Sequence, residues 1–170
     1  MKRILILILT AIICLSAFSG CAESPDEPVD LEVTFSDNLT NFPKEPPTLF
    51  VRDTDTRVKA WRGTCSWMVE GDDGLGHGIE SDSPHPLDCK DSLPVIDVGW
   101  LTTLTLSFEG HPIKITVKQY ALNATGYDDY EEINVKESTV KAKSGCIYEI
   151  IATWSGEKYS GTVYYAFRTE

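Results

Sequence analysis

Apolar and polar residues alternate through most of the chain after residue 57, and this two-residue period is the feature that most restricts the fold. Between residues 100 and 108, even positions hold Trp100, Leu104, Leu106 and Phe108, and odd positions hold Thr103, Thr105 and Ser107. Successive side chains of a β-strand point to opposite faces, so this pattern is typical of a half-buried strand. No segment of this part has a helical period, and the sequence therefore predicts an all-β domain.

Turn-forming residues separate the alternating runs and indicate how they pair. Glu109–Pro112 lies between the 100–108 run and a second run, 113–118, which predicts a hairpin. A glycine-bearing turn, 155–161, joins the runs 148–154 and 163–167. Several short strands at close spacing favour two antiparallel sheets packed face to face. We therefore expect an immunoglobulin-like β-sandwich.

The run from 57 to 69 carries two of the four tryptophans. Its odd positions place Trp61, Cys65 and Trp67 on one face. Gly63 lies inside the run and predicts a bulge or bend there. We expect buried tryptophans and tyrosines to supply much of the core, because each hides roughly 150 to 250 Å².

The first twenty residues have the form of a lipoprotein signal peptide. Lys2 and Arg3 precede an almost unbroken apolar run, 4–18, which is too short for a comfortable membrane span. Ser19 and Gly20 then precede Cys21, the arrangement found where a signal peptidase cuts before a lipid-modified cysteine. Phe18 stands where this type of site usually has leucine. The alternative is an ordinary secretory signal cut near Ser19, with Cys21 unmodified.

A lipidated Cys21 would be the mature N-terminus and would hold the protein at a membrane. Each buried methylene contributes roughly 0.8 kcal/mol, and two acyl chains anchor stably where one gives marginal attachment. The acidic, proline-bearing stretch behind it has no apolar periodicity and predicts a flexible tether. The expected divisions are a cleaved signal peptide at 1–20, the lipidated cysteine and tether at 21–47, and the β-sandwich at 48–170. The expected location is the extracytoplasmic face of a bacterial cell membrane.

The chain has an acidic excess that bears on its partners. Its formal net charge is −11, and it becomes −13 when Lys2 and Arg3 leave with the signal peptide. No basic stripe is present to neutralise phosphates, so nucleic acid is not expected as a partner. The same charge argues against electrostatic docking onto anionic lipid, which leaves the anchor at Cys21 as the contact with the membrane.

The alternating pattern breaks between Glu70 and Pro94, where glycines, acids and turn formers predominate. This segment predicts a long surface excursion, and binding residues often lie on loops that a rigid scaffold positions. The candidate binding residues in it are Asp72, His77, Asp82, His85 and Asp88. The alternative is a plain connection between the two sheets with no binding role.

Three cysteines remain in the domain after processing, namely Cys65, Cys89 and Cys146. A bridge between Cys65 and Cys89 would close a loop of about two dozen residues and stabilise the fold by roughly 3 kcal/mol. We favour this pair, while a Cys65–Cys146 bridge or no bridge at all stays open, because connectivity does not follow from sequence.

The sequence offers no convincing catalytic or cofactor motif, and we do not expect an enzyme. No combination of nucleophile, base and orienting group can be assembled from it. His77 and His85 with Asp82 and Asp88 match no zinc spacing, so neither a metal nor another cofactor is expected.

Four short segments carry a family resemblance: 59–67 (KAWRGTCSW), 82–88 (DSPHPLD), 148–154 (YEIIATW) and 164–167 (YYAF). They resemble segments of uncharacterised lipoproteins of Gram-positive bacteria, and of the extracellular parts of some peptidase-type antirepressor sensors. The resemblance covers roughly residues 48–168 and implies an extracytoplasmic sensing or binding module. The chain has no zinc-peptidase helix motif, so no protease activity carries over.

Together these features predict a membrane-anchored extracytoplasmic lipoprotein that binds or senses a ligand through the 70–94 excursion, with a cell-wall component or a protein as the expected partner. The alternative is a structural or adhesive surface domain whose sheets make the contacts. A concave, aromatic-lined pocket under the excursion would favour binding, and flat polar faces would favour the structural role.

Overall fold

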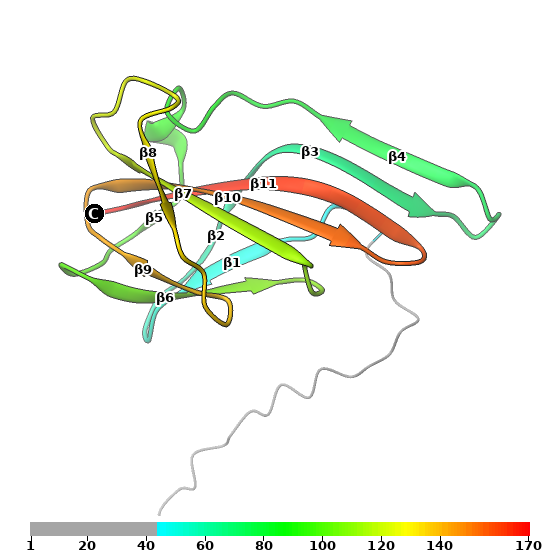
Figure 1. Cartoon of the computed structure of the whole chain (residues 1–170), viewed down its shortest axis with the longest axis horizontal. Coiled ribbons are helices and arrows are strands. Elements are labelled where there is room, and N and C mark those ends of the chain that lie inside the picture. Colours follow the sequence, from blue (N-terminus) through cyan, green and yellow to red (C-terminus); the bar gives the residue numbers. More distant parts are fainter. Residues whose placement is uncertain (1–43) are drawn as a thin grey trace, which may run out of the picture. The chain divides into compact units, whose positions relative to one another are not determined.

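The computed structural model describes residues 44–170, which form two β-sheets packed face to face (Figure 1). The small sheet has the strand order β2 (Arg57–Lys59), β1 (Leu49–Arg52), β6 (Thr102–Phe108) and β9 (Thr139–Ala142). The large sheet has the order β4 (Gly76–Ser81), β3 (Trp61–Glu70), β11 (Tyr159–Thr169), β10 (Cys146–Ser155), β7 (Lys114–Ala121) and β8 (Tyr130–Ile133). The short β5 (Val95–Ile96) pairs with β11 and is the parallel exception among these antiparallel pairs. The predicted all-β sandwich is confirmed.

Some of the predicted features lie before the described part of the chain or at its first residues. The signal peptide, Cys21 and most of the tether fall before residue 44. Pro46 and Pro47, which the sequence places in the tether, are buried. Tyr165 Oη donates to the Pro47 carbonyl at 2.6 Å and Arg62 Nη1 to the Pro46 carbonyl at 2.8 Å, so packed chain begins before residue 48. The described residues contain no helix of the length and apolarity that crossing a bilayer requires.

The hairpin predicted from β6 to β7 is wrong, although the β10–β11 hairpin is confirmed. β6 pairs with β1 and β9 in the small sheet, whereas β7 pairs with β10 and β8 in the large one. The connection crosses between the sheets: the Glu109 amide donates to the Thr48 carbonyl beside β1, and the Ile113 amide donates to the Thr153 carbonyl on β10. Alternation identifies a strand but not its partner, because it records only which side chains are buried.

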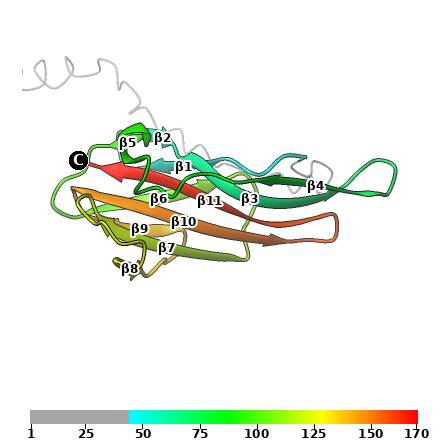
Figure 2. The ribbon, with the colours of Figure 1, turned by 90° about the horizontal axis from the view of Figure 1, so that it is seen from above.

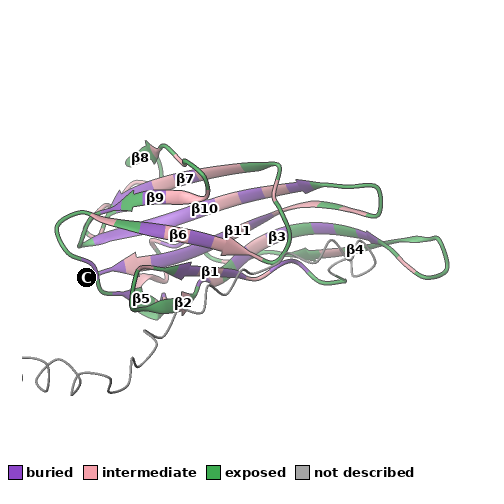
Figure 3. Ribbon diagram, turned by 90° about the horizontal axis from the view of Figure 1, so that it is seen from below, coloured by how far each residue is buried: buried purple, intermediate pink, exposed green. Residues whose placement is uncertain are grey.

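The strand before this crossing is shorter than predicted, and the strand after it begins one residue later than predicted but extends to Ala121. Trp100 is 93% exposed in the loop before β6, and Ile113 is 67% exposed before β7. Burial alternates along β6 and along β3 from Cys65 onward (Figure 3), whereas the first five residues of β10, 146–150, are all buried because both faces of the sheet are covered there. The main core lies between the sheets, and its large members include Trp67, Trp154, Tyr148, Tyr165 and Phe167. A second, smaller group lies on the outer side of the large sheet, and we call it the outer cluster: Leu93, Tyr120, Ile147 and Ala166 with Trp61, Leu87, Cys89, Leu122 and Ala124 packed against them.

Gly161 lets the two buried tryptophans meet in the main core. It lies opposite Trp67 on β3 and opposite Trp154 on β10, and the two indole rings pack edge to face with centroids 5.6 Å apart. A Cβ atom on Gly161 would overlap the Ser66 carbonyl oxygen and lie 2.8 Å from Trp67 Cε3. The carbonyl belongs to the backbone of the paired strand, and the Trp67 ring is packed in the main core. Neither group has room to move aside.

Replacing Gly161 with alanine is therefore expected to destabilise the fold by about 2 to 3 kcal/mol, through overpacking against β3. The free energy of unfolding from urea titration, followed by circular dichroism, measures this. Gly99→Ala is the matched control, since a Cβ there meets no atom closer than 3.9 Å. Equal midpoints for the two variants would contradict the close approach.

Candidate functional site

A bulge in β3 decides which side chains face outward from the large sheet. Cys65 pairs with Val163 and Arg62 pairs with Tyr165, so Gly63 and Thr64 together oppose the single residue between those partners. The bulge predicted at Gly63 is confirmed. The extra residue reverses the faces on the two sides of it, because side chains alternate with every residue.

Trp61 consequently lies on the opposite face from Cys65 and Trp67. It pairs with Ala166 and packs against the outer cluster, while the other two belong to the main core. The prediction that all three share one face is wrong, because it assumed an unbroken period of two. The Trp61 ring rests against Gly63, where an added Cβ would lie 3.1 Å from Trp61 Cζ3.

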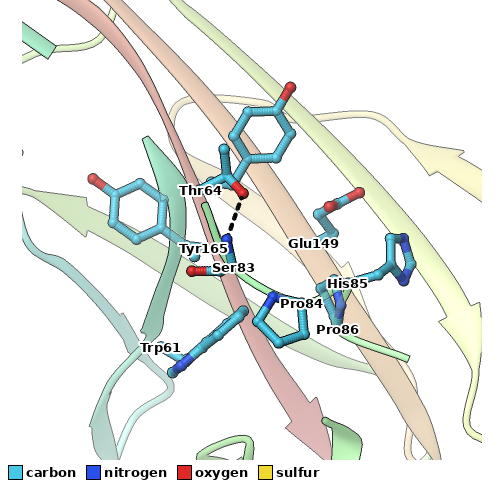
Figure 4. A pocket seen from close by; sticks show the side chains of 10 residues that line it. Trp61, Thr64, Ser83, Pro84, His85, Pro86, Glu149 and Tyr165 are labelled. Atoms are coloured by element: carbon cyan, nitrogen blue, oxygen red, sulfur yellow. Dashed lines mark hydrogen bonds between the residues drawn. The ribbon is translucent and has the colours of Figure 1, made fainter. Parts of the chain in front are cut away.

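The 70–94 segment is partly a strand and partly a cover over this outer face. β4 pairs along β3, and the β3–β4 hairpin projects beyond the neighbouring strand ends (Figure 2). The chain then crosses the sheet, where the Ser83 amide donates to Thr64 Oγ1 at 3.2 Å (Figure 4) and Pro86 is buried. A single 3₁₀ turn, Lys90–Ser92, leads on to β5.

A concave hollow of about 300 Å³ lies beneath the segment 83–86. Trp61 and Tyr164 line it from the sheet, and Trp61 lies beside Pro84 (Figure 4). Glu149 lines it from β10 and is only 5% exposed. The hollow therefore combines partly exposed aromatic rings with a buried carboxylate.

Glu149 belongs to a chain of polar contacts that ends at His85. Its Oε2 lies 3.4 Å from Lys118 Nζ and accepts from Tyr120 Oη at 3.3 Å. Tyr120 Oη lies 3.4 Å from His85 Nε2, and the Leu87 amide donates to His85 Nδ1 at 3.2 Å. Because Nδ1 accepts a hydrogen bond, the neutral ring carries its proton on Nε2 and donates it to Tyr120. The segment 83–86 is thus tied to Glu149 through Tyr120.

The Tyr120 phenol keeps its proton in this setting. Burial raises its pKa well above the ordinary value, and the negative charge of Glu149 raises it further. The hydroxyl can therefore serve as the donor to Glu149 across the physiological pH range.

Tyr127 holds the other side of His85. The two rings stack with centroids 4.3 Å apart, and Tyr127 Oη donates to Asp88 Oδ2 at 2.7 Å. That hydrogen bond raises the pKa of the Tyr127 phenol. Asp88 and His85 are thus joined through one tyrosine from the connection between β7 and β8.

The five candidate residues of the excursion do not form one site. His85 and Asp88 come together at Tyr127, and Asp82 lies at the edge of a neighbouring hollow. Asp72 and His77 lie at the exposed β3–β4 turn, where Asp72 is 3.5 Å from Lys44 and His77 Nε2 is 3.3 Å from Asp73. Across residues 44–170, no three His, Cys, Asp or Glu side chains gather closely enough to hold a metal ion.

The Cys65–Cys89 disulfide that the spacing favoured is not formed. All three cysteines of residues 44–170 are free thiols. Cys65 points into the main core while Cys89 packs against the outer cluster, so the large sheet separates them. Loop length alone does not show on which face of a sheet each cysteine lies.

Sequence reasoning missed Glu149, Tyr120 and Tyr164 as site residues. One signal was present for Glu149, because it is the one charged residue within the otherwise apolar segment 146–152. A buried carboxylate in a strand requires partners, and here Lys118 and Tyr120 supply them. Their positions on a neighbouring strand could not be inferred without the strand pairing.

Comparison with protein-family models, curated proteins and solved structures gives no match for this chain. The resemblance of its short segments to Gram-positive lipoproteins therefore stays a prediction. Function has to be inferred from the site itself.

Tyr120→Phe removes the hydroxyl that joins His85 to Glu149. We expect a loss of about 1 to 2 kcal/mol in the free energy of unfolding, because a buried carboxylate loses a donor. Urea denaturation measures it, with Tyr130→Phe as the control, since Tyr130 is 40% exposed on β8. If both variants unfold at the same urea concentration, the polar chain does not stabilise the fold.

Proposed function

We propose that this protein is a lipid-anchored extracytoplasmic binding protein, and that its β-sandwich offers the hollow beneath the segment 83–86 to a ligand. The observation that carries the proposal is the concave, aromatic-lined hollow with a buried carboxylate at Glu149. Binding sites for small ligands are typically concave, with apolar walls and a few polar groups that fix orientation. The hollow has this composition.

The way the hollow is built also supports a binding role. Strand pairing on both sides of the bulge fixes the wall that the large sheet forms. The segment 83–86, which covers the hollow, is held by the contacts of His85 with Tyr120 and Tyr127. A site formed in advance on a rigid scaffold spends less free energy on ordering when a ligand binds.

The second candidate is a structural or adhesive surface domain. The observation in its favour is the part of the outer face beyond the hollow, where the large sheet presents short hydroxyl side chains: Ser66, Thr153, Thr162 and Ser160. Such a face would contact a partner through these hydroxyl groups and not through Trp61. The two candidates differ in whether Trp61, within the hollow, is needed.

The binding role is tested by thermal shift of the purified full chain in detergent, using a muramidase digest of bacterial cell wall as the probe. We expect a rise in melting temperature that saturates, because a ligand bound only by the folded state stabilises it by about 2.7 kcal/mol at 100 times its Kd. Trp61→Leu should abolish the rise while Trp100→Leu retains it, since Trp100 is 93% exposed outside the hollow. Circular dichroism confirms that both variants fold. No shift with the digest, or an equal shift in both variants, would contradict binding in the hollow.

The anchor is tested at Cys21, which lies outside the described residues. Expressed in a bacterium, the chain should appear in the membrane fraction with a diacylglyceryl-cysteine as its first residue by mass spectrometry. Cys21→Ala should lose this modification, whereas Cys14→Ala should keep it, because Cys14 lies in the segment that is removed. An unmodified N-terminus near Ser19 would favour the ordinary secretory signal instead.

A further inference from the structure

The hollow at Trp61 continues into a second one along the same face of the large sheet. Thr64 and Tyr164 line both. The second hollow has a volume of about 450 Å³ and is bordered on the β4 side by Glu80, Ser81 and Asp82. A ligand longer than one ring could therefore extend from Trp61 toward β4 without leaving the surface.

The charges that line the two hollows have one sign. Glu149 lines the first, and Glu80 and Asp82 line the second. No lysine or arginine of the described residues lines either. Lys118 pairs with Glu149 Oε2 but is not part of the lining, and it lies 4.6 Å from the centre of the Tyr130 ring. Because Lys118 balances the charge of Glu149, the excess negative charge lies in the second hollow, at Glu80 and Asp82. That hollow disfavours phosphate, sulfate and uronate groups and favours a cation.

The uncharged part of the lining indicates what the cation is attached to. Trp61 and Tyr164 offer aromatic rings, which pack against apolar ring faces and attract ammonium groups. Hydroxyl groups line the second hollow: Thr64, Ser66, Ser81 and Thr162. Hydroxyls both donate and accept, so they suit a ligand that carries hydroxyls itself.

Resting on the proposed binding function, we infer that the ligand is an amino sugar with a free ammonium group, presented within a short glycan. One sugar ring lies against Trp61 and Tyr164 in the first hollow. The ammonium groups lie toward Glu80 and Asp82, and the next ring follows the hydroxyl-lined path toward β4.

Two tetrasaccharides that differ only in charge test this inference. Calorimetric titration of the full chain in detergent uses β-1,4-linked glucosamine tetrasaccharide and its fully N-acetylated counterpart, with tetralysine as a non-sugar cation. We expect the free amine to bind about tenfold more tightly than the acetylated form at low salt, and added salt to reduce this difference. Tetralysine should bind more weakly than the amine tetrasaccharide.

Substitution of the charged lining residues tests whether the tetrasaccharide binds at the second hollow. The double variant Glu80→Gln, Asp82→Asn should weaken binding of the amine tetrasaccharide roughly fivefold, since both carboxylates are solvent-exposed and the fold does not depend on them. Asp72→Asn, which removes a charge at the β3–β4 turn, should leave it unchanged.

The outcomes separate this inference from the function on which it rests. Equal or tighter binding of the acetylated tetrasaccharide overturns the need for charge, and equal binding of tetralysine overturns the need for a sugar. If neither tetrasaccharide binds while the cell-wall digest still gives a Trp61-dependent shift, the amino sugar is excluded and the binding function stands. If the digest also gives no shift, both fail.

Discussion

The bulge at Gly63 and Thr64 is the constraint on which the candidate site depends. One extra residue in β3 sends Trp67 into the main core and Trp61 to the outer face, within a single strand. Gly63 is suited to this position because it has no side chain to hold the Trp61 ring away from the sheet. Without the bulge, Trp61 would point between the sheets and the hollow would lose one of its walls.

A partly buried chain of polar side chains holds the segment 83–86 against the outer face of the large sheet. His85, Tyr120, Glu149 and Lys118 come from the segment after β4, from β7 and from β10, and each contacts the next. A buried carboxylate left without partners would be costly, so the chain fixes both the position of Glu149 and the path of the segment 83–86. Stability and site geometry thus depend on the same contacts.

The sequence predicted the local features of the fold better than its long-range pairing. Alternation identified two strands, predicted at 100–108 and 148–154 and found at 102–108 and 146–155, and Gly63 correctly marked the bulge. The same alternation assigned β7 to the wrong partner, because a short turn and a crossing between sheets look alike in sequence. Of the excursion residues, His85 and Asp88 lie close together, but their link through Tyr127 depends on a connection some forty residues away in the chain. Glu149 and Tyr120 meet only through the β7–β10 pairing.

Acrylamide quenching of tryptophan fluorescence measures directly whether the bulge leaves Trp61 available in a ligand-binding hollow. In a Trp100→Phe protein the remaining tryptophans are Trp61 and two that are each 1% exposed, Trp67 and Trp154. We expect one quenchable tryptophan in the free protein, and we expect the cell-wall digest to protect it. Three protected tryptophans in the free protein would contradict the outward position of Trp61. Quenching that the digest leaves unchanged would contradict the hollow as the binding site.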